Sequence, residues 1–355
     1  MTLTRLPRLR EKLRAKGLDA LLVTSLPNVR YLTGFTGSNA MVVVLPRTVY
    51  FLTDQRYRQQ SKEQVRGVRR IISRTTLFEA LSEHRLLRRG RVGFEAKHLS
   101  YASHRLLRRL LPGVDLRPVH ECVEDIALRK DDAEIALLSM AIRVTEQVFG
   151  RVLSLLRPGV RELEIAAEIT YLHRRLGAEG DAFEPIVASG ERGALPHARP
   201  SRRKMRNGDL VTLDFGCTVA GYCSDLTRTV AIGRASRRAR EVYRAVLTAQ
   251  TEALAAARPG MLAGDLDHVA RSRLKRAGFG RYFSHSLGHG IGLRIHERPR
   301  VAPRGRERLE VGSVVTIEPG VYLPGELGVR IEDDLVLTDD GCRVLTSAPK
   351  ELMVL

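Results

Sequence analysis

Short apolar runs alternate with amphipathic basic stretches through the first third of the chain. Four of these runs are rich in β-branched residues and predict strands: DALLVTSL (19–26), AMVVVLP (40–46), VYFLTD (49–54) and RVGFEA (91–96). Strands separated by helical segments are typical of an α/β unit. The sequence therefore predicts a small α/β domain over residues 1–125.

The pattern changes near Arg129, where a long helical period begins. In DDAEIALLSMAIRVTEQVFGRVLSLL the apolar residues recur at helical spacing. The acidic Asp131 and Asp132 lie at its start, where the helix dipole favours negative charge. We place a domain boundary here, and the second domain then covers residues 130–355.

The second domain contains an internal repeat. LLRPGVRELEIAAEITYL begins at Leu155 and AARPGMLAGDLDHVARSRL begins at Ala256. Both have an Arg-Pro-Gly loop followed by an acidic and then amphipathic helix, and Gly159 and Gly260 of the two loops are 101 residues apart. The domain is therefore predicted to consist of two related halves.

A hairpin with two carboxylates follows each repeat: Asp214 and Asp225 in the first half, Glu318 and Glu332 in the second. The first pair is symmetric about the 219/220 junction, and a turn there or at 220/221 leaves both side chains on one face. The second pair is symmetric about Gly325, within the turn-forming PGELG. Each hairpin should therefore present two carboxylates on one side.

Four carboxylates that converge in a folded core need protons or cations to compensate their charge. A pair that shares one proton, as in acid proteases, is one solution, but four acidic groups with a histidine favour divalent ions. The candidate is His289 in HSLGHGIGLRIHE, where Gly288 and Gly290 allow backbone and metal to approach closely. A phosphate-binding glycine loop is the alternative, but the sequence lacks the P-loop ending and the dinucleotide spacing.

Each of these five residues, taken alone, is more often a turn or surface residue than a ligand. The repeat-related pairing is what favours a metal site.

The net charge of +19, from 59 basic and 40 acidic residues, raises the question of nucleic acid. The densest basic clusters, SRRKMR (201–206) and ASRRAR (235–240), lack the interleaved aromatic residues that stack on bases. Aromatic residues make up 5% of the chain, and there is no Trp. We therefore expect no specific nucleic-acid partner.

Targeting and redox signals point to the cytoplasm. The sequence has no apolar run of about 18 residues, so no membrane partner is expected, and the N-terminal MTLTRLPRLREKLRAKG predicts a basic amphipathic helix without signal-peptide features. The four cysteines form no C-x-x-C pair and are too sparse for a disulfide framework. Reduced thiols fit a cytoplasmic protein.

Four blocks, in this order, closely resemble the signatures of the pita-bread metallopeptidases: DFGCTVAGYCSDLTRT, HSLGHGIGLRIHE, TIEPGVY and VRIEDD. That group contains methionine aminopeptidase, aminopeptidase P, prolidase and creatinase. From about residue 130 to the end, the resemblance implies an α+β pita-bread domain with a pseudo-twofold repeat. It also implies a centre of two divalent ions, with Mn expected and Co, Zn or Fe as alternatives. The implied ligands are Asp214, Asp225, His289, Glu318 and Glu332.

In that centre, the resemblance assigns Asp225 and Glu332 as bridging ligands. Creatinase-like members lack an intact metal set, and this sequence keeps all five positions, which argues against them.

The first domain narrows the choice within this family. NVRYLTGFTGS (28–38) and FLTDQRY (51–57) resemble the creatinase/prolidase type of N-terminal domain, which methionine aminopeptidases usually lack. The resemblance implies a homodimeric Xaa-Pro aminopeptidase that acts on peptides with proline at the second position, because the TDQRY part of FLTDQRY resembles that of compact bacterial aminopeptidase P relatives. The alternative is an Xaa-Pro dipeptidase (prolidase). A metal-free peptide-binding protein on the same fold is a further alternative, although such proteins typically lose ligands.

The same resemblance assigns further roles. SGERGALPHARPS resembles the segment that delivers a histidine to the active site, here His197, and the alternative is an ordinary loop histidine. His197 and His296 would bind the substrate carbonyl and the tetrahedral intermediate, and His285 would line the same cleft. Glu318 would transfer the proton. Arg330, on the strand face of Glu332, would hold the carboxylates, unless it forms an ordinary salt bridge.

Overall fold

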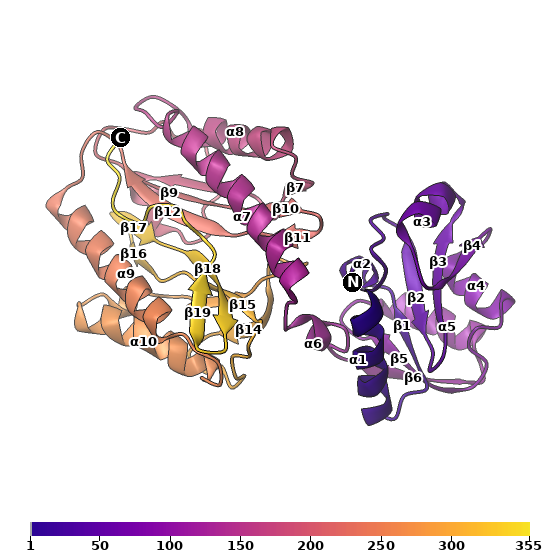
Figure 1. The fold of residues 1–355 in the computed structure, drawn as a ribbon. Coiled ribbons are helices and arrows are strands. Elements are labelled where there is room, and N and C mark those ends of the chain that lie inside the picture. Colours follow the sequence, from indigo (N-terminus) through magenta and orange to yellow (C-terminus); the bar gives the residue numbers. More distant parts are fainter. Residues whose placement is uncertain (1) are drawn as a thin grey trace. The chain divides into compact units, whose positions relative to one another are not determined.

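The computed structural model describes residues 2–355, and their side chains from residue 5 onward. The chain divides into two compact units, one ending at Ala127 and the other running from Leu128 to Leu355. Figure 1 shows the first unit in indigo to purple and the second in magenta to yellow. Each unit has its own apolar core.

A six-stranded sheet in the order β4-β3-β2-β1-β5-β6 organises the first unit, and β2 runs antiparallel to both of its neighbours while the other pairs are parallel. The strands are β1 (Ala20–Val23), β2 (Ala40–Val44), β3 (Val49–Asp54), β4 (Arg69–Ser73), β5 (Gly90–Glu95) and β6 (Val114–Val119). The helices are α1 (Thr2–Ala15), α2 (Leu26–Thr33), α3 (Arg58–Gln64), α4 (Leu77–Glu83), α5 (Tyr101–Leu110) and α6 (Glu124–Ala127), with a 3₁₀ turn η1 (Gln55–Tyr57).

The four predicted strands of this unit are confirmed as β1, β2, β3 and β5, and the predicted α/β class is confirmed with them. The two strands that the apolar runs did not predict, β4 and β6, are the edge strands of the sheet. Edge strands are half solvated, so β4 carries the exposed Arg69 and Arg70, and β6 accommodates Pro118. Their polarity hid them from the search for apolar runs.

The second unit combines helices with several antiparallel sheets. Its helices are α7 (Asp132–Leu153), α8 (Glu162–Arg175), α9 (Arg237–Ala256) and α10 (Ala263–Arg276), with 3₁₀ turns η2 (Gly190–Ala194) and η3 (Gly280–Tyr282). Its strands are β7 (Gly180–Asp181), β8 (Ile186–Ser189), β9 (Leu210–Phe215), β10 (Cys217–Val219), β11 (Tyr222–Cys223), β12 (Leu226–Ala231), β13 (Gly288–Gly290), β14 (Glu297–Val301), β15 (Val314–Ile317), β16 (Gly320–Leu323), β17 (Leu327–Arg330), β18 (Asp333–Thr338) and β19 (Gly341–Val344).

The predicted repeat is confirmed. Helices α8 and α10 have the same length, and both of their ends are 101 residues apart. The glycines of the two preceding loops adopt left-handed conformations, with φ of 91° at Gly159 and 82° at Gly260. Their backbone N–H groups donate to equivalent carbonyls, those of Met205 and Leu309. The predicted long helix is α7, whose N-terminus is capped by Asp131.

Each half of the second unit has its own helical cover (Figure 1). Val148 of α7 and Ile165 of α8 pack with Leu213 of β9 in one core. Val246 of α9 and Leu266 of α10 pack with the strands of the second half in another core. The two helix pairs therefore support the two hairpins on which the candidate ligands lie.

Candidate metal centre

The first carboxylate pair lies on a hairpin that turns at Ala220-Gly221. Both turn residues have positive φ, 48° and 85°, as a type I′ turn requires. In the register of β9 and β12, Asp214 pairs with Thr227, so Asp225 lies diagonally across from Asp214 on the same side. This is the 220/221 register that the sequence analysis allowed.

The second pair lies on a hairpin centred on Gly325, as predicted. Gly320 pairs with Arg330 in β16 and β17, and Ile317 pairs with Asp333 in β15 and β18. The same register places Glu318 opposite Glu332.

Breaks between successive strands bring the carboxylates together. Asp225 lies between β11 and β12, Glu318 between β15 and β16, and Glu332 between β17 and β18. The N–H of Glu332 donates to the carbonyl of Thr227, and the N–H of Asp225 donates to the Asp334 carboxylate at 3.2 Å. The backbone at these breaks therefore links the two halves of the repeat.

The fifth candidate, His289, lies on β13 between two glycines that the packing requires. A Cβ atom on Gly288 would lie 1.9 Å from the carbonyl oxygen of Thr316, and one on Gly290 would lie 2.1 Å from that of Arg298. The Nδ1 atom of His289 lies 3.1 Å from the Gly290 carbonyl. Because a carbonyl only accepts, Nδ1 carries the proton, and the Nε2 lone pair faces the carboxylates.

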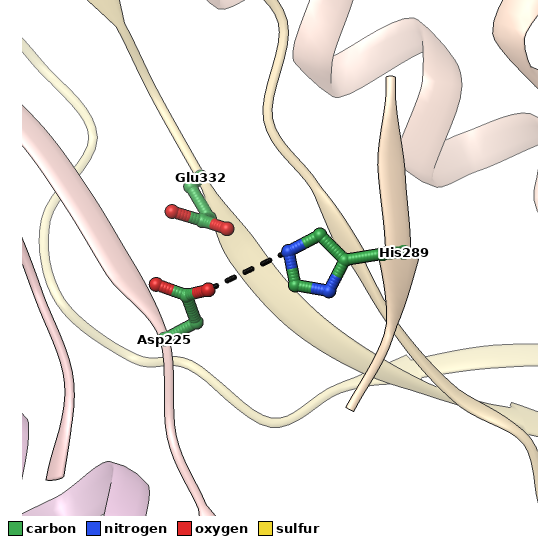
Figure 2. A group of neighbouring side chains, drawn as sticks. All are labelled: Asp225, His289 and Glu332. Carbon is green, nitrogen blue, oxygen red and sulfur yellow. Dashed lines mark ion pairs between the residues drawn. The ribbon is translucent and has the colours of Figure 1, made fainter. Parts of the chain in front are cut away.

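Three of the five candidates form a tight group (Figure 2). Asp225, His289 and Glu332 each offer a ligand atom within 4.8 Å of the others. The Nε2 atom of His289 lies 3.6 Å from Asp225 Oδ2 and 3.5 Å from Glu318 Oε1. Asp214 lines the same cavity, but its carboxylate is held by the Arg330 guanidinium.

The chemistry of this group suits a bound divalent cation. Burial, together with the neighbouring carboxylates, raises the pKa of Asp225 and Glu318 and raises the pKa of Glu332 to about 8. Burial and then His296 lower the pKa of His289 to about 4, so its imidazole is neutral. Asp225 Oδ1 and Glu332 Oε1 are buried and have no hydrogen-bond partner among the described residues. Carboxylate oxygens and a neutral imidazole suit divalent Mn, Fe, Co or Zn.

Arg330 contacts one candidate ligand directly and a second through a bridging threonine. Its guanidinium contacts Asp214, donates to Tyr322 Oη at 2.7 Å and to Thr227 Oγ1 at 3.2 Å. Thr227 in turn donates to Glu332 Oε2 at 2.6 Å. Arg330 therefore reaches Asp214 directly and Glu332 through Thr227, which is more than an isolated salt bridge.

A cavity of about 840 Å³ opens over this group, and the three other predicted histidines line it. His296 packs edge-on against His289, with ring centroids 4.4 Å apart. His285 uses both ring nitrogens within the protein, since Nδ1 lies 2.8 Å from the Ser286 carbonyl and Nε2 lies 2.8 Å from Tyr322 Oη. His197 and His296 are exposed in the cavity, and burial followed by the charge on His197 lowers the pKa of His296.

Sequence reasoning missed the polar residues that contact the candidate ligands. Thr316 accepts from the N–H of His289 and contacts Glu318, while Thr227 and Tyr322 connect Arg330 to its surroundings. Asp334 is fully buried beside Asp225. One signal could have revealed Asp334, because residues two apart in a strand share a face and Asp334 follows Glu332 by two.

Fold and site together define a metal-dependent enzyme with a duplicated, carboxylate-rich domain. The family model described as "Metallopeptidase family M24" matches residues 136–339, and the model described as "Creatinase/Prolidase N-terminal domain" matches residues 5–127. The chain belongs to metallopeptidase family M24 and has the pita-bread fold, and the peptidases of this family depend on divalent metal ions. The family and the fold expected from the motifs are confirmed.

Relatives match the chain over nearly its full length. An Xaa-Pro dipeptidase from Pyrococcus furiosus is 34% identical over 98% of this chain and 99% of its own. The structure titled "Xaa-Pro dipeptidase from Bacillus anthracis" matches with a TM-score of 0.96 and 38% identity, covering 100% of both chains. An X-Pro aminopeptidase structure from Thermotoga maritima matches with a TM-score of 0.91 and 36% identity, covering 97% of this chain and 100% of its own.

These findings favour the dipeptidase over the aminopeptidase that the FLTDQRY segment suggested. Separately, no helix in residues 2–355 is both long and apolar enough to span a bilayer.

Proposed function

We propose that this protein is an Xaa-Pro dipeptidase that uses two divalent ions, with Mn²⁺ as the expected metal. The observation that carries the proposal is the group of buried carboxylates and one neutral imidazole on the floor of a histidine-lined cavity. Asp214, Asp225, His289, Glu318 and Glu332 would hold the ions. When bound, the ions supply Lewis acidity, which polarises a peptide carbonyl and activates a water.

The protein's own groups handle the substrate and its protons. Glu318 lines the cavity beside His289, where its carboxylate would take a proton from the attacking water and pass it to the leaving nitrogen. The leaving group, a secondary amine of proline, departs only after protonation. His197 and His296 are available to hydrogen-bond the substrate carbonyl and the developing oxyanion. His285 instead holds Tyr322, and through it Arg330.

A dipeptide also carries a free carboxylate on its proline, which calls for a cation in the cavity wall. Three arginines line the cavity: Arg199, Arg300 and Arg330. Arg330 is occupied by Asp214, and Arg199 lies 3.6 Å from a Glu184 carboxylate oxygen. The Arg300 side chain contacts a neutral hydroxyl, that of Ser286, at 3.4 Å. Arg300 is therefore our candidate for binding the substrate carboxylate.

The proposed activity predicts a substrate preference. The protein, stripped with a chelator and reloaded with Mn²⁺, should cleave Xaa-Pro dipeptides with a kcat/KM at least about 10-fold higher than Xaa-Pro-Yaa tripeptides, because a tripeptide has no carboxylate on its proline to pair with the cation of the cavity wall. The stripped protein should cleave neither. A preference for tripeptides would show instead that the protein is an Xaa-Pro aminopeptidase. The absence of cleavage of either substrate by the Mn²⁺-loaded protein would exclude an Xaa-Pro peptidase.

Arg300→Gln should lower kcat/KM for an Xaa-Pro dipeptide by about 10- to 100-fold, mainly through KM, because it removes a charge-assisted contact made in both ground and transition states. The Xaa-Pro amide, which lacks the carboxylate, should be cleaved equally well by both forms. Arg199→Gln is the matched control from the same cavity, and it should not distinguish the two substrates. An equal loss on dipeptide and amide would rule out the assignment of Arg300.

A further inference from the structure

Two fully buried carboxylates occupy the repeat-related helices of the second unit. Glu162 is the first residue of α8, and Asp267 lies in the second turn of α10. Both side chains are 0% exposed, and each pairs with an arginine, Arg192 and Arg271 respectively. Buried charge is costly unless hydrogen bonds satisfy it, so the partners of each carboxylate show what the charge is used for.

The Glu162 carboxylate accepts five hydrogen bonds, all from one loop. Ser189 donates its N–H and its hydroxyl to Oε1, both at 2.8 Å. Ser201 donates its N–H at 3.0 Å and its hydroxyl at 2.6 Å to Oε2, and Arg192 Nε donates to Oε2 at 3.0 Å. Ser189 and Ser201 are the two ends of the segment that carries His197. One carboxylate thus holds both ends of this loop together.

The body of the loop is fixed by contacts with β17. A Cβ atom on Gly328 would lie 1.7 Å from the carbonyl oxygen of Gly193, so only glycine permits this approach of the two backbones. The Pro196 carbonyl, next to His197, accepts from Arg330 at 3.3 Å. The loop that carries His197 into the cavity is therefore held at both ends, at Gly193 and at Pro196.

Asp267 makes comparable contacts in the second half, from a position one helical turn further along its helix than Glu162. Its carboxylate accepts from the N–H of Leu287 at 3.0 Å and from Arg271, which in turn donates to the carbonyls of Phe283 and His285. This pair holds the segment that carries His285 and leads into His289. In both halves, then, a buried carboxylate with an arginine fixes a histidine-bearing segment of the cavity.

We propose that Glu162 is a positioning residue that acts on the reaction through His197, and that Asp267 has a comparable role for the His285 segment in the second half. The proposal rests on the proposed Xaa-Pro peptidase activity for its kinetic test. Glu162 is not one of the candidate metal ligands, and it does not line the cavity above them. Its effect is to keep the His197 imidazole where the substrate carbonyl becomes an oxyanion.

Glu162→Gln should lower kcat, rather than raise KM, by about 10- to 100-fold on an Xaa-Pro dipeptide, since a displacement of about 1 Å at a catalytic group has effects of this size. In the His197→Ala background the same substitution should change kcat by less than about 2-fold, because residues that act as one unit are not additive. Ser201→Ala, a milder change, should show the same pattern with a smaller loss. It carries the test if Glu162→Gln does not fold.

Asp267→Asn is the matched control, since it makes the same chemical change at a buried carboxylate of the other half, which also pairs with an arginine. Its loss of activity should persist in the His197→Ala background. Hydrogen exchange, which needs no activity, should rise in residues 190–200 for Glu162→Gln and in residues 283–287 for Asp267→Asn. Equal kinetic losses for Glu162→Gln in both backgrounds, or unchanged exchange in residues 190–200, would overturn the proposal. If the wild type cleaves no Xaa-Pro peptide, the proposed function fails, and the exchange measurement still decides the role of Glu162.

Discussion

Asp225→Asn is expected to abolish metal-dependent Xaa-Pro cleavage, with a loss of at least about 10³-fold, and yet to stabilise the metal-free protein. Asparagine keeps the shape of the side chain but supplies no negative charge for a cation. In the metal-free protein that negative charge is destabilising, because burial and the charges on Glu332, Asp214 and Asp334 all raise the pKa of Asp225. Removing it should raise the free energy of unfolding by on the order of 1 kcal/mol at neutral pH.

The sign of this effect depends on pH. Folding raises the pKa of Asp225, so the folded protein binds more protons than the unfolded chain, and wild-type stability falls as pH rises above about 3.9, the ordinary pKa of aspartate. The advantage of Asp225→Asn should therefore grow with pH and disappear below about pH 3.9. Urea unfolding in the presence of a chelator at several pH values measures it, and calorimetric titration with Mn²⁺ measures the loss of binding.

Asp54→Asn is the matched control in the N-terminal unit. The hydrogen bond from the Arg56 side chain holds the pKa of Asp54 well below its usual range, so removal of this carboxylate should not stabilise the protein. It should also leave Mn²⁺ affinity unchanged. If Asp225→Asn retained full Mn²⁺-dependent activity, Asp225 would not be a ligand.

Much of the arrangement of the candidate site could be predicted, because the position of the turn determines which residues of an antiparallel hairpin lie opposite each other. Each hairpin pairs residues whose positions are symmetric about its turn, so the spacing of Asp214 from Asp225 and of Glu318 from Glu332 already contained their arrangement. Turn-forming residues at Ala220-Gly221 and Gly325 limited the choice of centre. The breaks between strands, which bring the carboxylates together, follow no comparable sequence rule. They are seen only in the structure.

The residues that sequence reasoning missed act between distant segments. Glu162 meets Ser201 across 39 positions, and Thr227 meets Glu332 across 105. No local period or spacing connects such pairs, since their contact depends on how α8 and the two hairpins pack. The metal motifs likewise could not separate a dipeptidase from an aminopeptidase, because both belong to the family that these motifs resemble.

Arg330→Met is expected to have the largest effect on stability. Arg330 is 3% exposed and donates to an aspartate, a tyrosine, a threonine and the Pro196 carbonyl. Methionine fills a similar volume but leaves the buried Asp214 without its counterion, and breaking a buried pair from one side costs about 3–5 kcal/mol. Mn²⁺ should recover part of this loss by supplying the positive charge, so the metal-induced rise in Tm should be larger in the variant than in the wild type.

Arg330→Lys separates charge from geometry. Lysine restores a positive charge beside Asp214, so most of the stability lost in Arg330→Met should return, whereas its single ammonium group cannot reach four acceptors spread around a planar guanidinium. Activity should therefore stay at least about 10²-fold below wild type, because Thr227, which holds Glu332, and Pro196, which precedes His197, both lose their donor. Arg5→Lys, at a buried arginine of the N-terminal unit, is the control and should leave Mn²⁺ affinity unchanged. Wild-type activity in Arg330→Lys would mean that Arg330 supplies charge alone, and the link from the proposed metal ligands through Arg330 to the His197 loop would have no role in turnover.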